Sequence, residues 1–386
     1  MKRELLKHYR SPGALAPLEL TRVDLETADE IRAGELRCTA TGRTFEIKDG
    51  APHLIVAEHV SSMLRKDQAL IEEFDKNEVT QTANNTWPED ARKARAAYEK
   101  GMQANTEFLF QTLNFTDAPN RIAIEIGAGD TKLAARMRGL GFTLFTVDFA
   151  GFRICSTADR YMPKYGYFER AVGLMAELPF ATGTFDLVYM HASLHHATPL
   201  REEDFSWWSP NNLSDTLREI RRIMKPRDQG GMFILTGEGV YPENTPIADR
   251  HFEKSAQTSG CYESWYTQSE YEAQFRKTGL FPNIWSNQDD FVMYAYGYEP
   301  DGSRFDLLTS HDGLIAQEMY KVPRFWRRYA GPRLRHILPD WVQIKEPEKP
   351  RELTRTWMQS QKLFHKIVRR LKSVLRPCKL WIQARL

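Results

Sequence analysis

Residues 121–148 read RIAIEIGAGDTKLAARMRGLGFTLFTVD, and this stretch decides the fold. The hydrophobic run that ends at Ile126 predicts a strand buried on both faces. The glycines at 127 and 129 predict a tight turn, which is followed by a helix and then by a second strand over 144–147. Asp148 stands at the carboxyl end of that second strand, 21 residues after Gly127, where a carboxylate can accept both hydroxyls of a ribose. The stretch therefore predicts a unit that holds a nucleoside.

The same turn does not carry the dinucleotide-binding fingerprint, because Lys132 stands where that pattern requires a third glycine. Two further stretches narrow the interpretation: residues 178–196, LPFATGTFDLVYMHASLHH, and residues 215–235, DTLREIRRIMKPRDQGGMFIL. Together with E-x-G-x-G at 125–129, they resemble the class I S-adenosylmethionine-dependent methyltransferases, in particular the small-molecule branch. The resemblance covers about residues 119–297.

The resemblance implies an α/β fold, a Rossmann-like seven-stranded methyltransferase sheet with helices on both faces. A small β-rich N-terminal ribbon and a helical C-terminal tail would flank this sheet. The implied cofactor is S-adenosyl-L-methionine. Glu125 would support the amino end of its methionine tail, the backbone of Gly127, Ala128 and Gly129 would contact the same tail, and Asp148 would hold the ribose.

The adenine side departs from the family pattern. Members often carry an acid before the L-P-F motif, and Leu174 stands there in this chain. Adenine recognition is therefore expected from backbone groups and from packing against Met175. His191 is expected at the carboxyl end of the strand over 185–189, within reach of the cofactor.

His195 and His196 are the candidate catalytic residues, and we expect them to begin the next helix on the substrate side. A neutral imidazole is a suitable base for a hydroxyl, with His196 favoured over His195, although a capping and packing role is the alternative. Aromatic residues within 200–214 suggest a flap that lines an acceptor site or packs as a lid. The four cysteines form no C-x-x-C pair, so neither a disulfide framework nor a metal site is expected.

The N-terminal unit, residues 1–57, resembles a zinc-ribbon domain of the family that includes the activator of tRNA and protein methyltransferases. The stretch 34–55, GELRCTATGRTFEIKDGAPHLI, carries this resemblance. Cys38 matches one zinc ligand of that family, whereas Ser11, Ala14 and Thr41 stand at the other three positions. One cysteine cannot build a tetrahedral zinc site, so we expect a metal-less ribbon that acts in docking. A plain β-hairpin cap is the alternative.

Residues 58–118 show helical spacing and are interpreted as a lid or bridge, residues 119–300 as the methyltransferase domain, and residues 301–386 as a basic helical region. Residues 320–386 hold 18 Lys/Arg against 4 Asp/Glu, and the remaining chain holds 35 against 47. The helix expected over 362–376 is basic on one face and hydrophobic on the other. It suits an anionic membrane, an acidic partner or the acidic body of the same protein, and its hydrophobic stripe argues against nucleic acid.

These observations predict methyl transfer to a small-molecule, sugar or lipid-linked acceptor, and an oxygen atom of the acceptor is the favoured site of methylation. The absence of a hydrophobic N-terminal stretch predicts a cytoplasmic protein, with peripheral contact at the inner membrane face as an option. Two alternatives stay open. One is an RNA or protein methyltransferase, and the other is a non-catalytic scaffold that retains the fold.

Overall fold

The computed structural model describes residues 1–62, 113–238, 240–241, 243–250, 262–280, 293–296, 307–309 and 340–344, together with 64–66, 68–69, 72–73 and 76–77. All of them belong to the first of two compact units, Met1–Lys345 and Glu346–Leu386. The basic helix expected over 362–376 lies outside the described residues. So do residues 78–112 of the segment interpreted as a helical lid or bridge, and Leu113 after them begins the short strand β5 (Leu113–Phe115).

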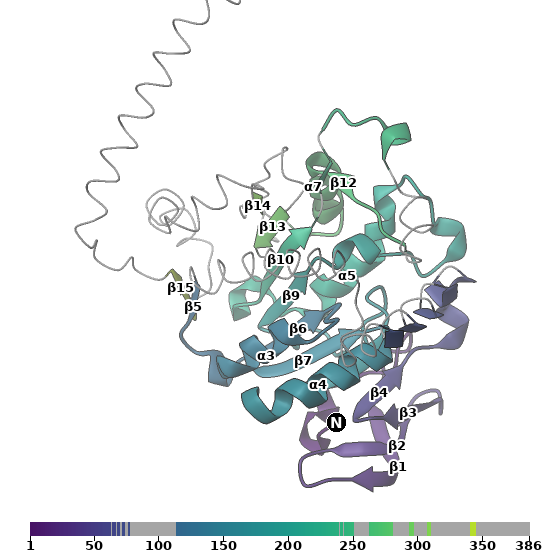
Figure 1. Cartoon of the computed structure of the whole chain (residues 1–386), viewed down its shortest axis with the longest axis vertical. Coiled ribbons are helices and arrows are strands. Elements are labelled where there is room, and N and C mark those ends of the chain that lie inside the picture. The colour runs from purple at the N-terminus through teal and green to yellow at the C-terminus, as the bar shows by residue number, and fades with distance from the viewer. Residues whose placement is uncertain are drawn as a thin grey trace, which may run out of the picture. The chain divides into compact units, whose positions relative to one another are not determined.

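One continuous sheet forms the centre of the described structure. Its eleven strands lie in the order β1-β2-β3-β4-β8-β7-β6-β9-β10-β13-β14 (Figure 1). The strands from β8 onward match the expected seven-stranded methyltransferase sheet: β6 (Ile122–Ile126), β7 (Thr143–Asp148), β8 (Glu169–Gly173), β9 (Leu187–His191), β10 (Met232–Glu238), β13 (Met293–Tyr296) and β14 (Leu307–Thr309). The first five are parallel to one another, whereas β13 runs antiparallel to β10, and β14 runs antiparallel to β13.

Helices cover both faces because successive strand residues point to opposite sides. Ala123, Leu144 and Leu187 pack with α3 (Lys132–Gly139) and α4 (Gly151–Tyr165). Their neighbours in sequence pack on the other face with α5 (Ser214–Ile223) and α7 (Gln268–Lys277). A capping box between Thr267 and Glu270 fixes the start of α7. The helix predicted after the glycine turn is confirmed as α3.

The N-terminal strands are β1 (Leu18–Glu26), β2 (Ile31–Cys38), β3 (Thr44–Lys48) and β4 (Ala51–Leu54), preceded by the 3₁₀ helix η1 (Arg3–His8). Successive pairs are antiparallel, so the expected hairpins are present. β4 then pairs in parallel with β8 through His53 and Leu54, so these strands extend the methyltransferase sheet.

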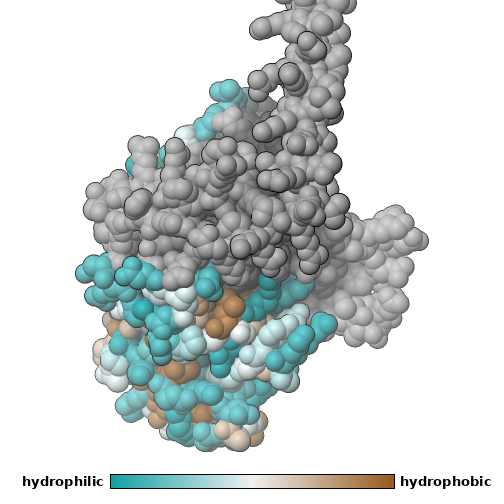
Figure 2. All heavy atoms as spheres, turned by 90° about the vertical axis from the view of Figure 1, so that its left-hand side faces the viewer, coloured by the Kyte–Doolittle hydropathy of each residue, from teal (hydrophilic) through white to brown (hydrophobic). Residues whose placement is uncertain are grey.

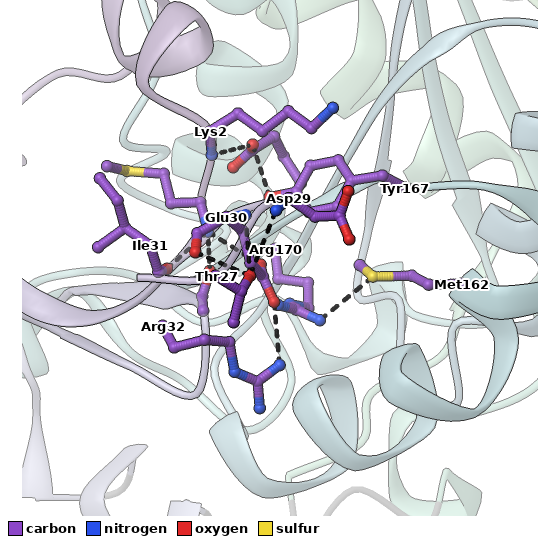
Figure 3. Close-up of polar contacts among 12 residues, drawn as sticks. Lys2, Thr27, Asp29, Glu30, Ile31, Arg32, Met162, Tyr167 and Arg170 are labelled. Carbon is purple, nitrogen blue, oxygen red and sulfur yellow. Dashed lines mark hydrogen bonds and ion pairs between the residues drawn. The ribbon is translucent and has the colours of Figure 1, made fainter. Parts of the chain in front are cut away.

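A buried polar cluster fastens the N-terminal strands to the central sheet (Figure 3). The Arg170 side chain on β8 is fully buried, and its Nη2 donates to Oε2 of Glu30 at 2.6 Å. The amino group of Met1 donates to the same oxygen at 3.0 Å. Beside this pair, Glu169 accepts hydrogen bonds from the hydroxyls of Tyr9 and Tyr167. Charges from both parts of the sheet are therefore satisfied only when the two parts are together.

Short elements connect these strands and helices. They are η2 (Ala57–His59), η3 (Ala118–Asn120), η4 (Leu194–His196), η5 (Glu202–Asp204), η6 (Pro210–Leu213), η7 (Arg227–Gln229), η8 (Ile247–Asp249), and the paired strands β11 (Val240–Tyr241) with β12 (Tyr266–Thr267) and β5 with β15 (Val342–Ile344). Figure 2 shows a mainly hydrophilic described surface with hydrophobic side chains scattered over it. Among the described residues, no helix combines the length and hydrophobicity that crossing a bilayer requires.

Candidate active site

The order of the parallel strands reverses between β6 and β9, which lie side by side. The chain runs from β6 through β7 to β8 on one side and then returns to β9 and β10 on the other. Ligands of open α/β sheets bind where the strand order reverses in this way. The turn after β6 carries Glu125 to Gly129, and the segment after β9 carries His191 to His196, so both predicted groups of site residues meet at this point.

Glu125 lies at the end of β6 with a carboxylate that is only partly satisfied. The residue is 3% exposed, and its Oε2 has no hydrogen-bond partner in the described structure. Burial, with a smaller contribution from Asp130, raises the pKa of this carboxyl well above its ordinary value. A buried acceptor without a donor favours a bound donor, and above all a cationic one.

The two glycines of the turn have different surroundings, although both have positive φ. A Cβ on Gly127 would lie 2.5 Å from Cβ of Ser193, whose hydroxyl donates to the carbonyl of Ile126. A Cβ on Gly129 would have nothing within 4 Å. Gly127 is therefore required by packing against the segment after β9, whereas Gly129 faces open space where a ligand can approach the backbone.

Asp148 ends β7 beside this turn. Its Oδ2 accepts the backbone N–H of Gly129 at 2.9 Å, and its Oδ1 accepts that of Ala150 at 3.0 Å. Each oxygen keeps a second lone pair, so the carboxylate can still accept two ribose hydroxyls. Ala128 completes the turn, and its N–H donates to the carbonyl of Val147. The predicted cofactor residues at 125, 127, 128, 129 and 148 thus lie together.

The segment after β8 is hydrophobic at the position of the missing acid. Leu174 is 4% exposed and packs with Val60 and Leu64. Met175 is partly buried against the main core. Its contact with adenine stays a prediction. Nearby, a cavity of about 710 Å³ lies between residues 58–65 and the loop 200–203, with Glu177 in its wall.

His191 ends β9 and is buried. Its Nδ1 lies 2.6 Å from Oγ1 of Thr236 on β10, and the Tyr189 hydroxyl lies 2.6 Å from the same oxygen. Burial lowers the pKa of His191 to about 4, so its imidazole is neutral at physiological pH. A neutral ring that is held in place by a hydrogen bond is better suited to packing against a cofactor than to transferring a proton.

His195 is paired with a residue that we did not predict, Glu238. The Nδ1 of His195 lies 2.8 Å from Oε2 of Glu238, which is fully buried at the end of β10. Glu238 also accepts the backbone N–H groups of Ser193, Leu194 and His195. Burial alone would lower the pKa of His195, but this carboxylate raises it above its ordinary value. The signal in the sequence was the position of Glu238, an acidic residue at the end of a parallel strand, as Asp148 is.

His196 has a different environment. Its Nδ1 lies 2.8 Å from the carbonyl oxygen of Tyr262, and burial and His195 lower its pKa to about 3. The two imidazole centroids are 4.2 Å apart. Both histidines lie in the helix η4, where the next helix was expected to begin, but this helix is a single turn of 3₁₀ type. Thr198 precedes Pro199, and a residue before proline is driven away from helical geometry.

Aromatic side chains line the same side of the site. Phe205 and Trp207 pack against Tyr262, with ring centroids 5.1 and 5.7 Å away. The neighbouring Trp208 is 59% exposed. Part of the expected flap is therefore packed as a lid, and one indole of it faces solvent.

Comparison with known proteins identifies the central domain. Residues 124–235 match the methyltransferase domain family. The chain carries a class I methyltransferase domain. S-adenosylmethionine is the cofactor of this domain, and the residues of the methyltransferase domain fit it on two observations. Glu125 offers a buried acceptor without a donor, and the Gly129 backbone is open to a ligand.

Similar proteins cover only part of the chain. An uncharacterised methyltransferase of Synechocystis sp. is 26% identical over 122 residues, which are 32% of this chain and 49% of that protein. The chain thus spans about half the length of this curated relative. A solved complex of the Haloferax volcanii Trm112 methyltransferase activator and a putative methyltransferase is 19% identical, with a TM-score of 0.39 over 55% of this chain and 99% of that chain. A putative methyltransferase of Bacillus halodurans is 17% identical, with a TM-score of 0.36 over 46% and 68%.

Proposed function

We propose that the whole chain transfers a methyl group from S-adenosylmethionine to a hydroxyl oxygen of a small-molecule, sugar or lipid-linked acceptor. The observation that carries this proposal is the pairing of an unsatisfied buried carboxylate, Glu125, with the ribose-type acid Asp148 across one glycine turn. Two acidic groups at the ends of neighbouring strands suit the amino group and the ribose of one cofactor molecule.

The protein supplies orientation, while the cofactor supplies the electrophilic methyl group on its sulfonium. Glu125 holds the amino end of the methionine tail, Gly127 to Gly129 present backbone to the tail, and Asp148 holds the ribose. Met175 and Leu174 provide a hydrophobic surface for adenine. Holding the two reactants in line can supply roughly 7–11 kcal/mol of the barrier reduction.

The acceptor binds beside the segment that follows β9. His195 and His196 lie beside its hydroxyl, and Glu238 orients His195 through Nδ1. The exposed Trp208 offers a flat hydrophobic face of the kind that sugar and aromatic rings stack on.

We propose that the N-terminal strands are a metal-less ribbon that acts as a fixed docking element. Ser11 and Thr41 lie close enough to the buried Cys38 to lower the pKa of its thiol, so three of the four positions aligned with zinc ligands are close together. We also propose that the protein is cytoplasmic and that its basic segment 362–376 contacts an anionic membrane surface or an acidic protein.

Calorimetric titration of the full chain with S-adenosylmethionine and with its demethylated product tests the proposal. We expect micromolar binding of both, weakened at least tenfold in Asp148→Ala. The matched control is Asp24→Ala, which removes an exposed acid from an ion pair with Arg22 on β1. Absence of binding by the unaltered protein would leave the scaffold alternative. Binding that persists unchanged in Asp148→Ala would refute the assignment of the ribose site.

A further inference from the structure

The segment Tyr262–Trp265 is fixed against η4 by two hydrogen bonds that flank Glu263. The backbone N–H of Ser264 donates to the carbonyl of His195 at 2.8 Å, and the carbonyl of Tyr262 accepts from Nδ1 of His196 at 2.8 Å. Glu263 lies between these two anchors. One potential ligand atom of His195, of His196 and of Glu263 lies within 4.8 Å of the other two.

The hydrogen bonds of the histidines decide which ring nitrogens are free. A backbone carbonyl only accepts, so Nδ1 of His196 carries the proton and Nε2 keeps its lone pair. The Nδ1 of His195 faces the carboxylate of Glu238 in the same way. Histidines that bind metals almost always donate the other ring N–H to a carboxylate or a backbone carbonyl. Both partners of that arrangement are present here, one for each ring.

A third observation indicates that a polar group belongs beside this cluster. The indole of Trp265 packs near His195, with ring centroids 6.4 Å apart, and its Nε1 is buried without a hydrogen-bond acceptor in the described structure. A buried N–H donor without an acceptor is rare. An oxygen atom of a bound molecule would satisfy it.

We propose that His195, His196 and Glu263 bind a divalent first-row transition metal ion through the two Nε2 atoms and one carboxylate oxygen. Ligand atoms lie about 2.0–2.2 Å from such an ion, so the three groups would draw closer together when the ion binds. Two imidazoles and one carboxylate leave at least one coordination position open, which is typical of catalytic rather than structural sites.

The role of the ion rests on the proposed function, whereas its binding does not. The acceptor hydroxyl takes the open position, and its oxygen loses its proton to water because the ion lowers the pKa of bound hydroxyl groups. The oxygen then forms the new bond to the methyl carbon while the sulfur–methyl bond breaks. The electron pair of that bond stays on sulfur, so the sulfonium becomes a neutral thioether, and one proton is released for each methyl transferred.

Titration of the chelator-treated full chain with Co²⁺ and with Zn²⁺ tests the site directly. We expect one ion to bind with a visible Co²⁺ spectrum of nitrogen and oxygen ligation and without a thiolate charge-transfer band. His196→Ala and Glu263→Gln should each weaken binding at least 100-fold. Glu238→Gln, which keeps all three ligands, should weaken it by about 10- to 100-fold. His59→Ala is the matched control, because His59 also pairs with a buried acid, Glu177, but lies outside the cluster.

Circular dichroism and S-adenosylmethionine binding show whether each variant is folded. The proposal would be overturned by an unaltered protein that binds no Co²⁺. It would also be overturned if His196→Ala and Glu263→Gln bound Co²⁺ as tightly as the unaltered protein. A thiolate charge-transfer band would also overturn the proposal, because it would show that a cysteine ligates the ion. Metal binding without methyl transfer would count against the proposed function and leave the metal site standing.

Discussion

Replacement of Glu30 by glutamine should cost the protein roughly 3 kcal/mol of folding free energy at neutral pH. Burial alone would raise the pKa of Glu30, but Arg170 and the amino group of Met1 lower it from 4.5 to about 2. That difference corresponds to roughly 3 kcal/mol, since one pKa unit is about 1.4 kcal/mol. Loss of one partner from a buried ion pair costs about 3–5 kcal/mol, which agrees. Glutamine keeps the volume and leaves the buried guanidinium of Arg170 without its closest counter-charge.

Urea denaturation followed by circular dichroism measures the difference. Glu26→Gln is the matched control, because Glu26 pairs with Arg3 while both side chains are exposed, and its loss should change stability little. The stabilisation from Glu30 belongs to a carboxyl whose folded pKa is lowered. It is therefore complete above 4.5 and is lost as the pH falls toward about 2, so the two proteins should converge in acid. A Glu30→Gln protein within about 1 kcal/mol of the unaltered one at neutral pH would refute the reasoning.

Two further predictions concern the glycine turn. Burial raises the pKa of Glu125, so the folded state favours its protonated form, and the stability from this group is lost as the pH rises. Glu125→Gln should therefore raise the melting temperature at pH 7–8 by roughly 2–4 °C. The same variant should bind S-adenosylmethionine at least tenfold more weakly. Calorimetry in buffers of different ionisation enthalpy should show proton release on cofactor binding that this variant lacks, and equal proton release in both would contradict the assignment. Gly127→Ala should destabilise by roughly 2–4 kcal/mol in urea, because the new Cβ meets Ser193 at 2.5 Å, and Ser193→Gly should recover part of that loss. Gly129→Ala should cost only about 1 kcal/mol of stability but weaken cofactor binding, so equal stability losses at the two glycines would be evidence against their different roles.

The local elements could be predicted from the sequence because their signals are local. The strand to Ile126, the turn and the helix after it depend on residues within a single span, and so does the start of α7 at Thr267. The partner of His195 was missed for the opposite reason. Glu238 reaches that ring only because β10 lies beside β9, and strand order is a property of the whole sheet.

Two other differences have similar causes. Gly127 was interpreted as a residue that lets a ligand approach, and that contact stays a prediction, but its packing against Ser193 from the segment after β9 was not foreseen. The L-H-H motif was expected to begin the next helix, and it lies in a single 3₁₀ turn that ends at His196, because Ala197 is extended and Pro199 follows. In both cases a distant segment or a following residue overrides the local pattern.

The pairing of β4 with β8 has a consequence for solubility. A methyltransferase sheet without the N-terminal strands would end at β8, and the backbone N–H and C=O groups of its edge would lack the partners that β4 provides at His53 and Leu54. Unpaired edges of this kind recruit other strands and lead to aggregation. The N-terminal strands replace that edge with β1, whose outward side chains include the charged pair of Arg22 and Asp24. Charged side chains on an edge strand disfavour pairing with another chain, so β1 is a less favourable template for such pairing than the bare edge of β8 would be.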